Sequence, residues 1–323
     1  MNRNSRVKGC MIGGAIGDAF GKPVELMSYH SILKKYGPNG IEHLELNKDG
    51  LAEITDDTQM TLFTVEALIK SHKTKSDLEA ELYQAYLRWL YTQGEISSSE
   101  IIQEGDLINL KPMNIRKGPG STCLSSLKSG IKGTLKNKIN HSKGCGGVMR
   151  VAPIGLLYDK DQAFDLGCMA AAITHGHPSG YLSAGALAYI ISSILEGTDP
   201  YTATNLAMEK LIEINECDEC IEAMANAIDL SYLDIPPEQA ISKIGEGWTG
   251  EEALSIAIYC CIKSPYDFHQ AIMMAANHSG DSDTTASITG SIIGTYLGIE
   301  KIPQYLIECI ELHDQIIHMA EKL

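Results

Sequence analysis

The sequence predicts an all-α fold, and three observations support this. Hydrophobic residues make up 44% of the 323 residues, enough for a large core, but aromatic residues make up only 6%. A core of mainly Ile, Leu, Ala and Met suits helices better than a β-sandwich. Apolar residues recur every three to four positions along most of the chain, whereas alternating strand patterns are almost absent. No linker, repeat or low-complexity segment interrupts this pattern, so we expect a single domain over residues 1–323.

The helical periodicity can be followed segment by segment along the chain. It predicts helices over residues 56–71, 77–91, 161–174, 179–195, 201–214, 218–232, 236–244, 251–263, 266–276, 282–296 and 303–321. Prolines mark several of the starts. Residues 41–46 have at best the alternation of one hairpin arm. Glycine and proline predict loops at 92–121 and 133–150, and loops this long in a helical protein are often functional.

Charge and cysteine content restrict the partners and the compartment. With 26 Lys and Arg against 41 Asp and Glu, the formal charge is −15, so nucleic acid is not an expected partner. Nine cysteines without a framework spacing predict reduced thiols and a cytoplasmic location. The apolar N-terminal stretch is short and runs directly into Asp18, unlike a signal peptide. We see no stretch of about 18 apolar residues and expect no membrane partner.

Two acidic turns, each directly before an apolar helix, are the strongest functional signal. They are Ile54-Thr-Asp-Asp-Thr58 and Gly280-Asp-Ser-Asp-Thr284, more than 220 residues apart. Helix capping is one explanation, because Asp, Ser and Thr are preferred N-caps. Metal binding is the other, because four carboxylates and two hydroxyls suit two hard cations about 3.5–4 Å apart. The spacing alone leaves both explanations open.

A glycine-rich segment, residues 141–150, and a pair of histidines are weaker signals. The bare glycines would let backbone N–H groups approach an anion, and Lys143 and Arg150 could add positive charge. The segment matches neither a Walker loop nor a dinucleotide fingerprint, so a tight turn is the alternative. His175 and His177 lie between two predicted helices, where they would cap a helix or contact a ligand.

Five blocks, in this order, resemble the ADP-ribosylglycohydrolase family. They are GGAIGDAFGKPVE, ITDDTQMTLFTVEAL, KGCGGVMRVAPIGLL, ITHGHPSGYLSAGALAYII and HSGDSDTTASITGSIIG, and the resemblance runs from about residue 6 to about residue 300. It implies an all-α domain whose cleft holds a binuclear centre of Mg²⁺ or Mn²⁺. It assigns the metal ligands to Thr55, Asp56, Asp57, Asp281, Asp283 and Thr284.

The same resemblance implies where the substrate binds. The diphosphate would lie on the glycine-rich loop, formed by Ser142, Lys143, Gly144, Gly146 and Gly147. The family often has Asn where this chain has Cys145, so we expect this loop to act through its backbone. His175 would contact the distal ribose and phosphate region, and Trp248 or Tyr232 would form the wall against the adenine. Glu25 would lie over the metals as a mobile gate.

The resemblance implies an enzyme that removes ADP-ribose from modified protein side chains, with ADP-ribose as product. Cleavage at ribose C1″ would develop oxocarbenium character, and Asp57, Asp283 or Glu25 would transfer the proton. Residues 116–123 resemble a block of the arginine-type enzymes, with Lys117-Gly118 replacing one residue. Acidic residues of the loop 92–121 (Glu95, Glu104 and Asp106) would suit a guanidinium leaving group.

The sequence therefore favours arginine-linked ADP-ribose as the substrate. Three alternatives remain open: hydrolysis of serine O-linked ADP-ribose, ADP-ribose binding without catalysis, and phosphohydrolysis of the diphosphate.

Overall fold

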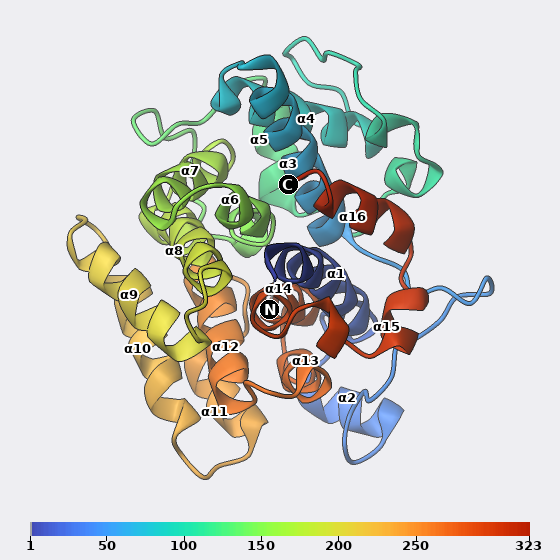
Figure 1. Cartoon of the computed structure of the whole chain (residues 1–323), viewed down its shortest axis with the longest axis vertical. Helices are drawn as coiled ribbons and strands as arrows, with labels where there is room; N and C mark the ends of the chain where they lie inside the picture. The colour runs from blue at the N-terminus through green and yellow to red at the C-terminus, as the bar shows by residue number, and fades with distance from the viewer. Residues whose placement is uncertain (1) are drawn as a thin grey trace.

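Two helices from opposite ends of the sequence, α1 (Arg3–Gly21) and α14 (Ser282–Leu297), lie side by side at the centre of the molecule (Figure 1). In this computed structural model, which describes residues 2–323, glycines at every fourth position of α1 face small residues of α14. A Cβ on Gly17 would lie 1.9 Å from the Ala286 carbonyl oxygen, and one on Gly21 would lie 2.1 Å from that of Ser282. The two backbones therefore touch, which brings the end of α1 against the start of α14.

The other helices surround this central pair (Figure 1). They are α2 (Tyr29–Tyr36), α3 (Asp56–Thr74), α4 (Leu78–Thr92), α5 (Ser121–Lys128), α6 (Ala152–Leu157), α7 (Lys160–Ala172), α8 (Pro178–Leu195), α9 (Pro200–Ile212), α10 (Asp218–Ser231), α11 (Pro237–Ile244), α12 (Gly250–Lys263), α13 (Phe268–Ala276), α15 (Gln304–Glu308) and α16 (His313–Ala320). Helices α4, α7, α9 and α13 begin after an aspartate whose side chain accepts a backbone N–H of the first turn. The all-α prediction is confirmed.

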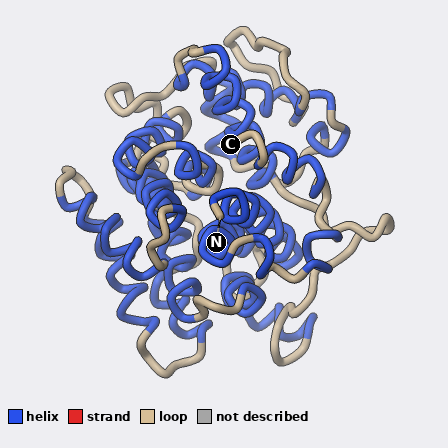
Figure 2. The backbone as a smooth tube through the Cα atoms, in the orientation of Figure 1, coloured by secondary structure: helices blue, strands red, loops and turns tan. Residues whose placement is uncertain are grey.

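Two predictions of local structure were wrong. The segment 303–321 is not one helix, because the chain turns at Leu312, whose φ of 63° is left-handed, and separates α15 from α16. Residues 41–46 do not form a strand (Figure 2). Side chains from α13 and its C-terminal end instead bond the backbone of the first two residues: Asn277 bonds both the N–H and the carbonyl of Ile41, and His269 bonds the carbonyl of Glu42.

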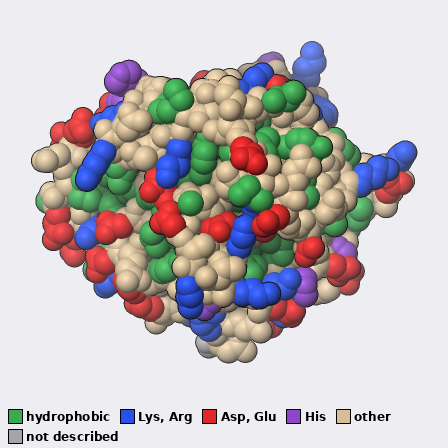
Figure 3. Space-filling view, turned by 90° about the horizontal axis from the view of Figure 1, so that it is seen from above, with side chains coloured by type: hydrophobic (Ala, Val, Ile, Leu, Met, Phe, Trp, Pro, Cys, Tyr) green, Lys and Arg blue, Asp and Glu red, His purple; other side chains and the backbone are tan. Residues whose placement is uncertain are grey.

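Helix α8 corrects a third expectation, that no stretch is apolar enough to span a bilayer. Helix α8 is long and apolar enough to span a bilayer by length and composition. However, 89% of it is buried inside the fold, as in the core helix of a globular protein. On the face shown in Figure 3, basic and acidic side chains are interspersed rather than gathered into separate patches.

The two predicted loops contain only short helical turns. The segment 92–121 includes the 3-10 helices η2 (Leu107–Asn109) and η3 (Lys111–Asn114), and 133–150 includes η4 (Cys145–Gly147). Within residues 2–323, extended pairing is limited to two isolated bridges, Ala52 with Ile310 and Gly144 with Thr249. The second bridge lies beside the candidate site.

Candidate active site

The two acidic turns meet in space. Asp56 and Asp57 form the first turn of α3, and Asp281 and Asp283 lie at the start of α14. The Thr284 hydroxyl donates a hydrogen bond to Asp57 Oδ1 over 3.3 Å. All six predicted metal ligands are buried. The two turns are therefore parts of one centre, although 227 positions separate Asp57 from Thr284.

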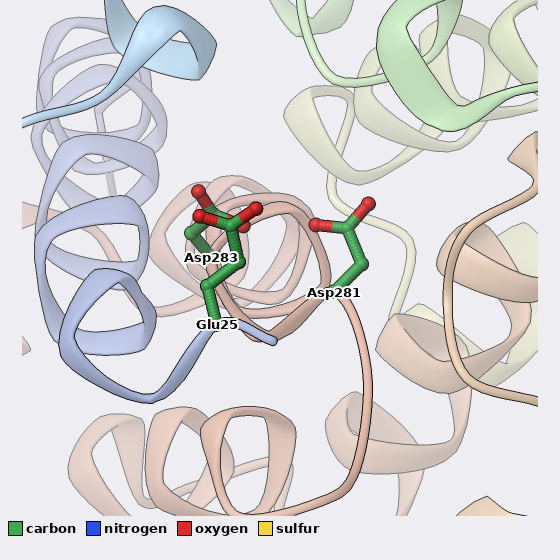
Figure 4. A group of neighbouring side chains, drawn as sticks. All are labelled: Glu25, Asp281 and Asp283. Atoms are coloured by element: carbon green, nitrogen blue, oxygen red, sulfur yellow. The ribbon is translucent and has the colours of Figure 1, made fainter. Parts of the chain in front are cut away.

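Glu25 completes this acidic centre from a third segment. It follows α1 and the 3-10 helix η1 (Lys22–Val24). Figure 4 shows its carboxylate beside that of Asp283, with Asp281 facing both, and one oxygen of each lies within 4.8 Å of the others. Burial, together with the charges of Asp281 and Asp18, raises the pKa of Glu25 to about 7. Glu25 is therefore part of the acidic centre, while its expected role as a mobile gate stays a prediction.

Asp18 fixes the start of α3 and was not singled out from the sequence. Its carboxylate is fully buried in α1 and accepts the backbone N–H groups of Thr55 at 2.9 Å and of Thr58 at 3.1 Å. It also accepts the Thr58 hydroxyl at 2.5 Å. Because these are the free donors at a helix N-terminus, Asp18 holds the first acidic turn onto α1. An acid within the apolar, glycine-rich second half of α1 was the available signal.

Capping accounts for only part of this arrangement. Thr55 is the N-cap of α3 and accepts the Asp57 N–H at 3.2 Å, and Asp283 accepts the N–H of Thr284 at 2.9 Å. Asp281, the N-cap residue of α14, makes no such bond. Asp57 Oδ2 is buried and has no hydrogen-bond partner in the described part of the chain. More carboxylate oxygens are present than the helix starts can use.

The electrostatics of these carboxylates favour a bound cation. Desolvation by burial raises the pKa of Asp56, Asp57 and Asp283 well above its usual value, and repulsion by neighbouring carboxylates adds to the shift. A divalent cation would offset both effects. Hard cations prefer oxygen ligands of this kind, so the unpartnered Asp57 oxygen and the crowded carboxylates fit a metal centre.

The end of the loop 92–121 reaches this centre. The Lys117 carbonyl accepts the Asp56 N–H at 3.0 Å, and the Gly120 N–H donates to Asp56 Oδ2 at 3.2 Å. A buried ion pair between Lys117 and Glu311, with an N–O distance of 2.7 Å, anchors the segment. Residues 117–120 thus orient one of the predicted metal ligands.

The acidic residues of that loop are not gathered at the centre. Glu95 forms ion pairs with Arg116 at 3.0 Å and Lys128 at 2.7 Å. Glu104 pairs with Lys70 at 3.0 Å, and Asp106 lies exposed between η2 and Glu104. Because cations of this chain already neutralise Glu95 and Glu104, the structure gives no support to these residues as the guanidinium contacts.

Residues 246–250 connect the glycine-rich loop to the acidic centre. Of this segment, only Trp248 was predicted from the sequence to have a role. The Trp248 carbonyl accepts the Cys145 N–H at 3.1 Å, and the Lys143 carbonyl accepts the Gly250 N–H at 2.8 Å. In the same segment, the Glu246 carbonyl accepts the Asp281 N–H at 2.8 Å. Residues 246–250 therefore tie the loop to the second acidic turn. The glycines at 245, 247 and 250 were the available signal.

The charged side chains of the loop have partners within the chain. Lys143 Nζ lies between Glu219 and Glu251, at 3.1 and 3.0 Å. Arg150 is fully buried, donates to the Ala170 carbonyl and the Thr174 hydroxyl, and stacks on Tyr86. Arg150 therefore supports the core beneath the loop.

The histidines have different roles in the structure. His175 is buried against Gly146, where an added Cβ would lie 3.2 Å from its ring. Burial, with a contribution from Arg150, lowers the pKa of His175 to about 3, so the ring is neutral. Its Nδ1 lies 2.8 Å from the Thr174 hydroxyl. His177 instead caps α8 by accepting the Ser179 N–H at 3.1 Å.

The two aromatic candidates differ in position. Trp248 is 38% exposed, and its indole N–H donates to Glu246 at 3.1 Å, next to the glycine-rich loop. Tyr232 is 68% exposed and packs edge-on against Tyr201 at the end of α10. The first turn of that helix carries Glu219, the partner of Lys143. Since a helix of 14 residues is about 21 Å long, Tyr232 lies far from the loop.

Comparison with known proteins assigns the chain to a family. The family model described as ADP-ribosylglycohydrolase matches residues 1–323. The chain belongs to the ADP-ribosylglycohydrolase family. It is 25% identical to ADP-ribosylhydrolase ARH3 of Mus musculus, over 99% of this chain and 91% of the mouse protein. It is 24% identical to ADP-ribosylarginine hydrolase Tri1 of Serratia proteamaculans, over 98% of this chain and 78% of that protein.

A solved structure described as an ADP-ribosylglycohydrolase-related protein complex has the same fold. The TM-score is 0.65 at 22% identity, and the match covers 99% of this chain and 97% of the other. The family membership predicted from the five sequence blocks is confirmed.

Proposed function

We propose that this protein is a hydrolase that releases ADP-ribose from modified protein side chains, above all from arginine. One observation carries the proposal: carboxylates from three distant segments, with Glu25, Asp57, Asp281 and Asp283 among them, converge in a buried centre beside a glycine-rich loop. Membership of the family supports a glycohydrolase, and the relatives named above support an ADP-ribosylated substrate.

The centre is suited to two divalent cations, Mg²⁺ or Mn²⁺. The ligands would be Thr55, Asp56, Asp57, Asp281, Asp283 and Thr284. Cations bound there supply Lewis acidity toward a water molecule and charge that orients the ribose hydroxyls. The crowding of carboxylates and the unpartnered Asp57 oxygen support this ligand set.

Different residues of this chain would bind the substrate and transfer the proton. The glycine-rich loop, formed by Ser142, Lys143, Gly144, Gly146 and Gly147, would hold the diphosphate, and the exposed Trp248 beside it would face the adenine. His175 would support the loop from below, because its neutral ring packs against Gly146. Glu25, whose carboxylate oxygen lies within 4.8 Å of oxygens of Asp281 and Asp283, suits the transfer of the water proton, assisted by Asp57 and Asp283.

The preference for arginine rests on the segment 116–123 and on the relative named ADP-ribosylarginine hydrolase. It no longer rests on Glu95 or Glu104, which pair with cations of this chain. All nine cysteines are free thiols, which supports a reducing compartment such as the cytoplasm.

A substrate panel tests the proposal. Peptides carrying ADP-ribose on arginine, serine or asparagine are incubated with the protein and Mg²⁺ or Mn²⁺, and the products are identified by mass spectrometry. We expect intact ADP-ribose and an unmodified arginine peptide. Release from serine alone would contradict the arginine assignment. AMP as product would indicate cleavage of the diphosphate, and ligand retained without release would indicate a binding protein.

A further inference from the structure

The thiol of Cys145 lies within the acidic centre. Its Sγ is 2.7 Å from Asp281 Oδ2 and 3.9 Å from the Thr284 hydroxyl oxygen. Other thiol-to-oxygen contacts in the chain are longer, at 3.8 Å for Cys123, 3.7 Å for Cys220 and 3.7 Å for Cys261. Those three involve backbone carbonyls, whereas Cys145 faces a carboxylate. The sulfur therefore lies closer to a predicted metal ligand than ordinary packing of a thiol requires.

The backbone holds Cys145 in this position. Its N–H donates to the Trp248 carbonyl, and its carbonyl accepts the N–H of Val148 at 2.9 Å at the end of η4. Because Glu246, two residues before Trp248, also bonds the Asp281 N–H, the thiol and the Asp281 carboxylate are fixed on the same segment. Their proximity is a consequence of the backbone arrangement.

A second observation points to a ligand at this place. Asp57 Oδ2 is buried without a hydrogen-bond partner in residues 2–323, while Asp57 Oδ1 accepts the hydroxyl of Thr284. Thr284 thus contacts both Asp57 and Cys145. The Asp57 carboxylate, which carries the unpartnered oxygen, and the Cys145 thiol therefore contact the same residue, Thr284, where the two acidic turns meet.

We propose that Cys145 is itself a ligand of the metal centre, which gives this chain a site for sulfur-binding divalent cations such as Co²⁺, Zn²⁺ or Cd²⁺. The inference rests on the proposed function only in that the acidic turns hold a cation. With metal–sulfur and metal–oxygen bonds of about 2.3 and about 2.0–2.2 Å, two ligands of one ion lie about 3.1 Å apart at a right angle and about 3.6 Å apart at a tetrahedral angle. The Cys145 and Asp281 atoms, 2.7 Å apart, would therefore have to separate by less than about 1 Å to hold one ion between them.

The binding step needs no oxidant or reductant. The S–H bond breaks, its proton passes to solvent, and the sulfur electron pair forms the bond to the cation. Because thiolate is a soft ligand, it favours Co²⁺, Zn²⁺ and Cd²⁺ over Mg²⁺. It would also connect the glycine-rich loop to the metal centre through a side chain, in addition to the backbone contacts expected from the sequence.

Absorption spectroscopy with Co²⁺ alone tests the proposal. The metal-free protein is titrated with one equivalent of Co²⁺, and the sulfur-to-cobalt charge-transfer band in the near ultraviolet is recorded. We expect the band in the unmodified protein and its loss in Cys145→Ser and Cys145→Ala, while the weaker visible bands of oxygen-bound Co²⁺ remain. Those remaining bands, with an unchanged circular dichroism spectrum, show that the variants still fold and bind metal.

Two other cysteines provide matched controls. Cys309→Ser replaces a thiol of similar partial exposure, and Cys217→Ser removes one thiol of the Cys217-x-x-Cys220 pair. Both should keep the band. In competition, Cys145→Ser should lower the affinity for Cd²⁺ at least about tenfold and change that for Mn²⁺ far less.

The outcomes separate this proposal from the proposed function. If the unmodified protein shows visible Co²⁺ bands without the charge-transfer band, Cys145 is not a ligand, but the acidic turns still bind metal. A charge-transfer band that survives in Cys145→Ser but is lost in Cys217→Ser would also overturn it. Failure to bind Co²⁺ at all would overturn both.

Discussion

The Thr284 hydroxyl donates to Asp57 across 3.3 Å and joins the two acidic turns directly. The bond connects the first turn of α14 to the first turn of α3, next to the backbone contact of α1 with α14. The geometry of the centre is therefore built by helix packing, and a cation would find the carboxylates already assembled. Stability and metal binding should respond separately to substitutions in the framework and in the ligands.

Asp18→Asn should destabilise the protein. The carboxylate accepts two backbone N–H groups and one hydroxyl in a fully buried position, whereas an amide would point an N–H₂ group at donors. A buried, unpaired polar group costs on the order of 1–3 kcal/mol. We expect the free energy of unfolding, measured in urea, to fall by about 2 kcal/mol. Asp49→Asn, in an exposed turn, is the control, and an equal effect of both would refute this role of Asp18.

Gly17→Ala should separate α1 from α14. The new methyl group would lie 1.9 Å from the Ala286 carbonyl oxygen and 2.8 Å from the Ser287 nitrogen, and neither backbone atom can move aside as a flexible side chain could. Overpacking in cores costs about 1–3 kcal/mol, and this contact with a backbone atom lies at or beyond the upper end. The midpoint of thermal unfolding should fall markedly. Gly120→Ala, whose Cβ would meet nothing within 4 Å, should leave it nearly unchanged. Similar midpoints for both variants would contradict the tight packing.

In the metal-free protein, the buried carboxyls should contribute stability that is lost as the pH rises. Burial raises the pKa of Glu25 from 4.5 to about 7 and shifts Asp56, Asp57 and Asp283 in the same direction. The folded state therefore holds these protons more tightly than the unfolded state. The stabilisation is complete below the unfolded pKa and is lost as the pH passes through the folded pKa.

For Glu25 this loss falls between pH about 4.5 and about 7. The buried His175, whose pKa is lowered from 6.5 to about 3, acts in the opposite sense up to pH about 6.5. The unfolding midpoint of the unmodified protein in a chelating buffer should therefore fall more with pH than that of a variant without the Glu25 carboxyl, and excess Mn²⁺ should raise it at neutral pH. Glu25→Gln should flatten the decline. A variant whose pH profile runs parallel to that of the unmodified protein would show that Glu25 does not titrate in this range.

Much of the fold could be predicted because periodicity is a local property. Helices α3, α4 and α7 to α14 were found within a few residues of their observed ends, whereas the short helices α5 and α6 were not predicted, and α15 and α16 were predicted as one helix. Helix α1 was not predicted, since its glycines lower its apolar character and its partner α14 lies at the other end of the chain. The spacing of Gly9, Gly13, Gly17 and Gly21 acquires its meaning only when the small residues of α14 are placed opposite.

The acidic part of the site could be predicted because it carries more negative charge than helix capping requires. Two carboxylates at each of two helix starts exceed what capping uses, and the structure brings both pairs together. Contacts made through the backbone left no such signal: the segment 246–250 joins Cys145 to Asp281 by carbonyl and N–H groups that every residue carries. The pairing of Glu95 with Arg116 and Lys128 likewise depends on how a long loop folds back, which its sequence does not specify.

Calorimetric titration with Mn²⁺ tests the central claim most directly, because a shared centre makes the two turns interdependent. The unmodified protein is compared with Asp57→Asn on α3 and Asp281→Asn before α14, with circular dichroism as the check on folding. We expect either substitution to remove metal binding or reduce its stoichiometry, and to abolish ADP-ribose release while the helical fold persists. Unaltered stoichiometry and full activity in both variants would contradict the account.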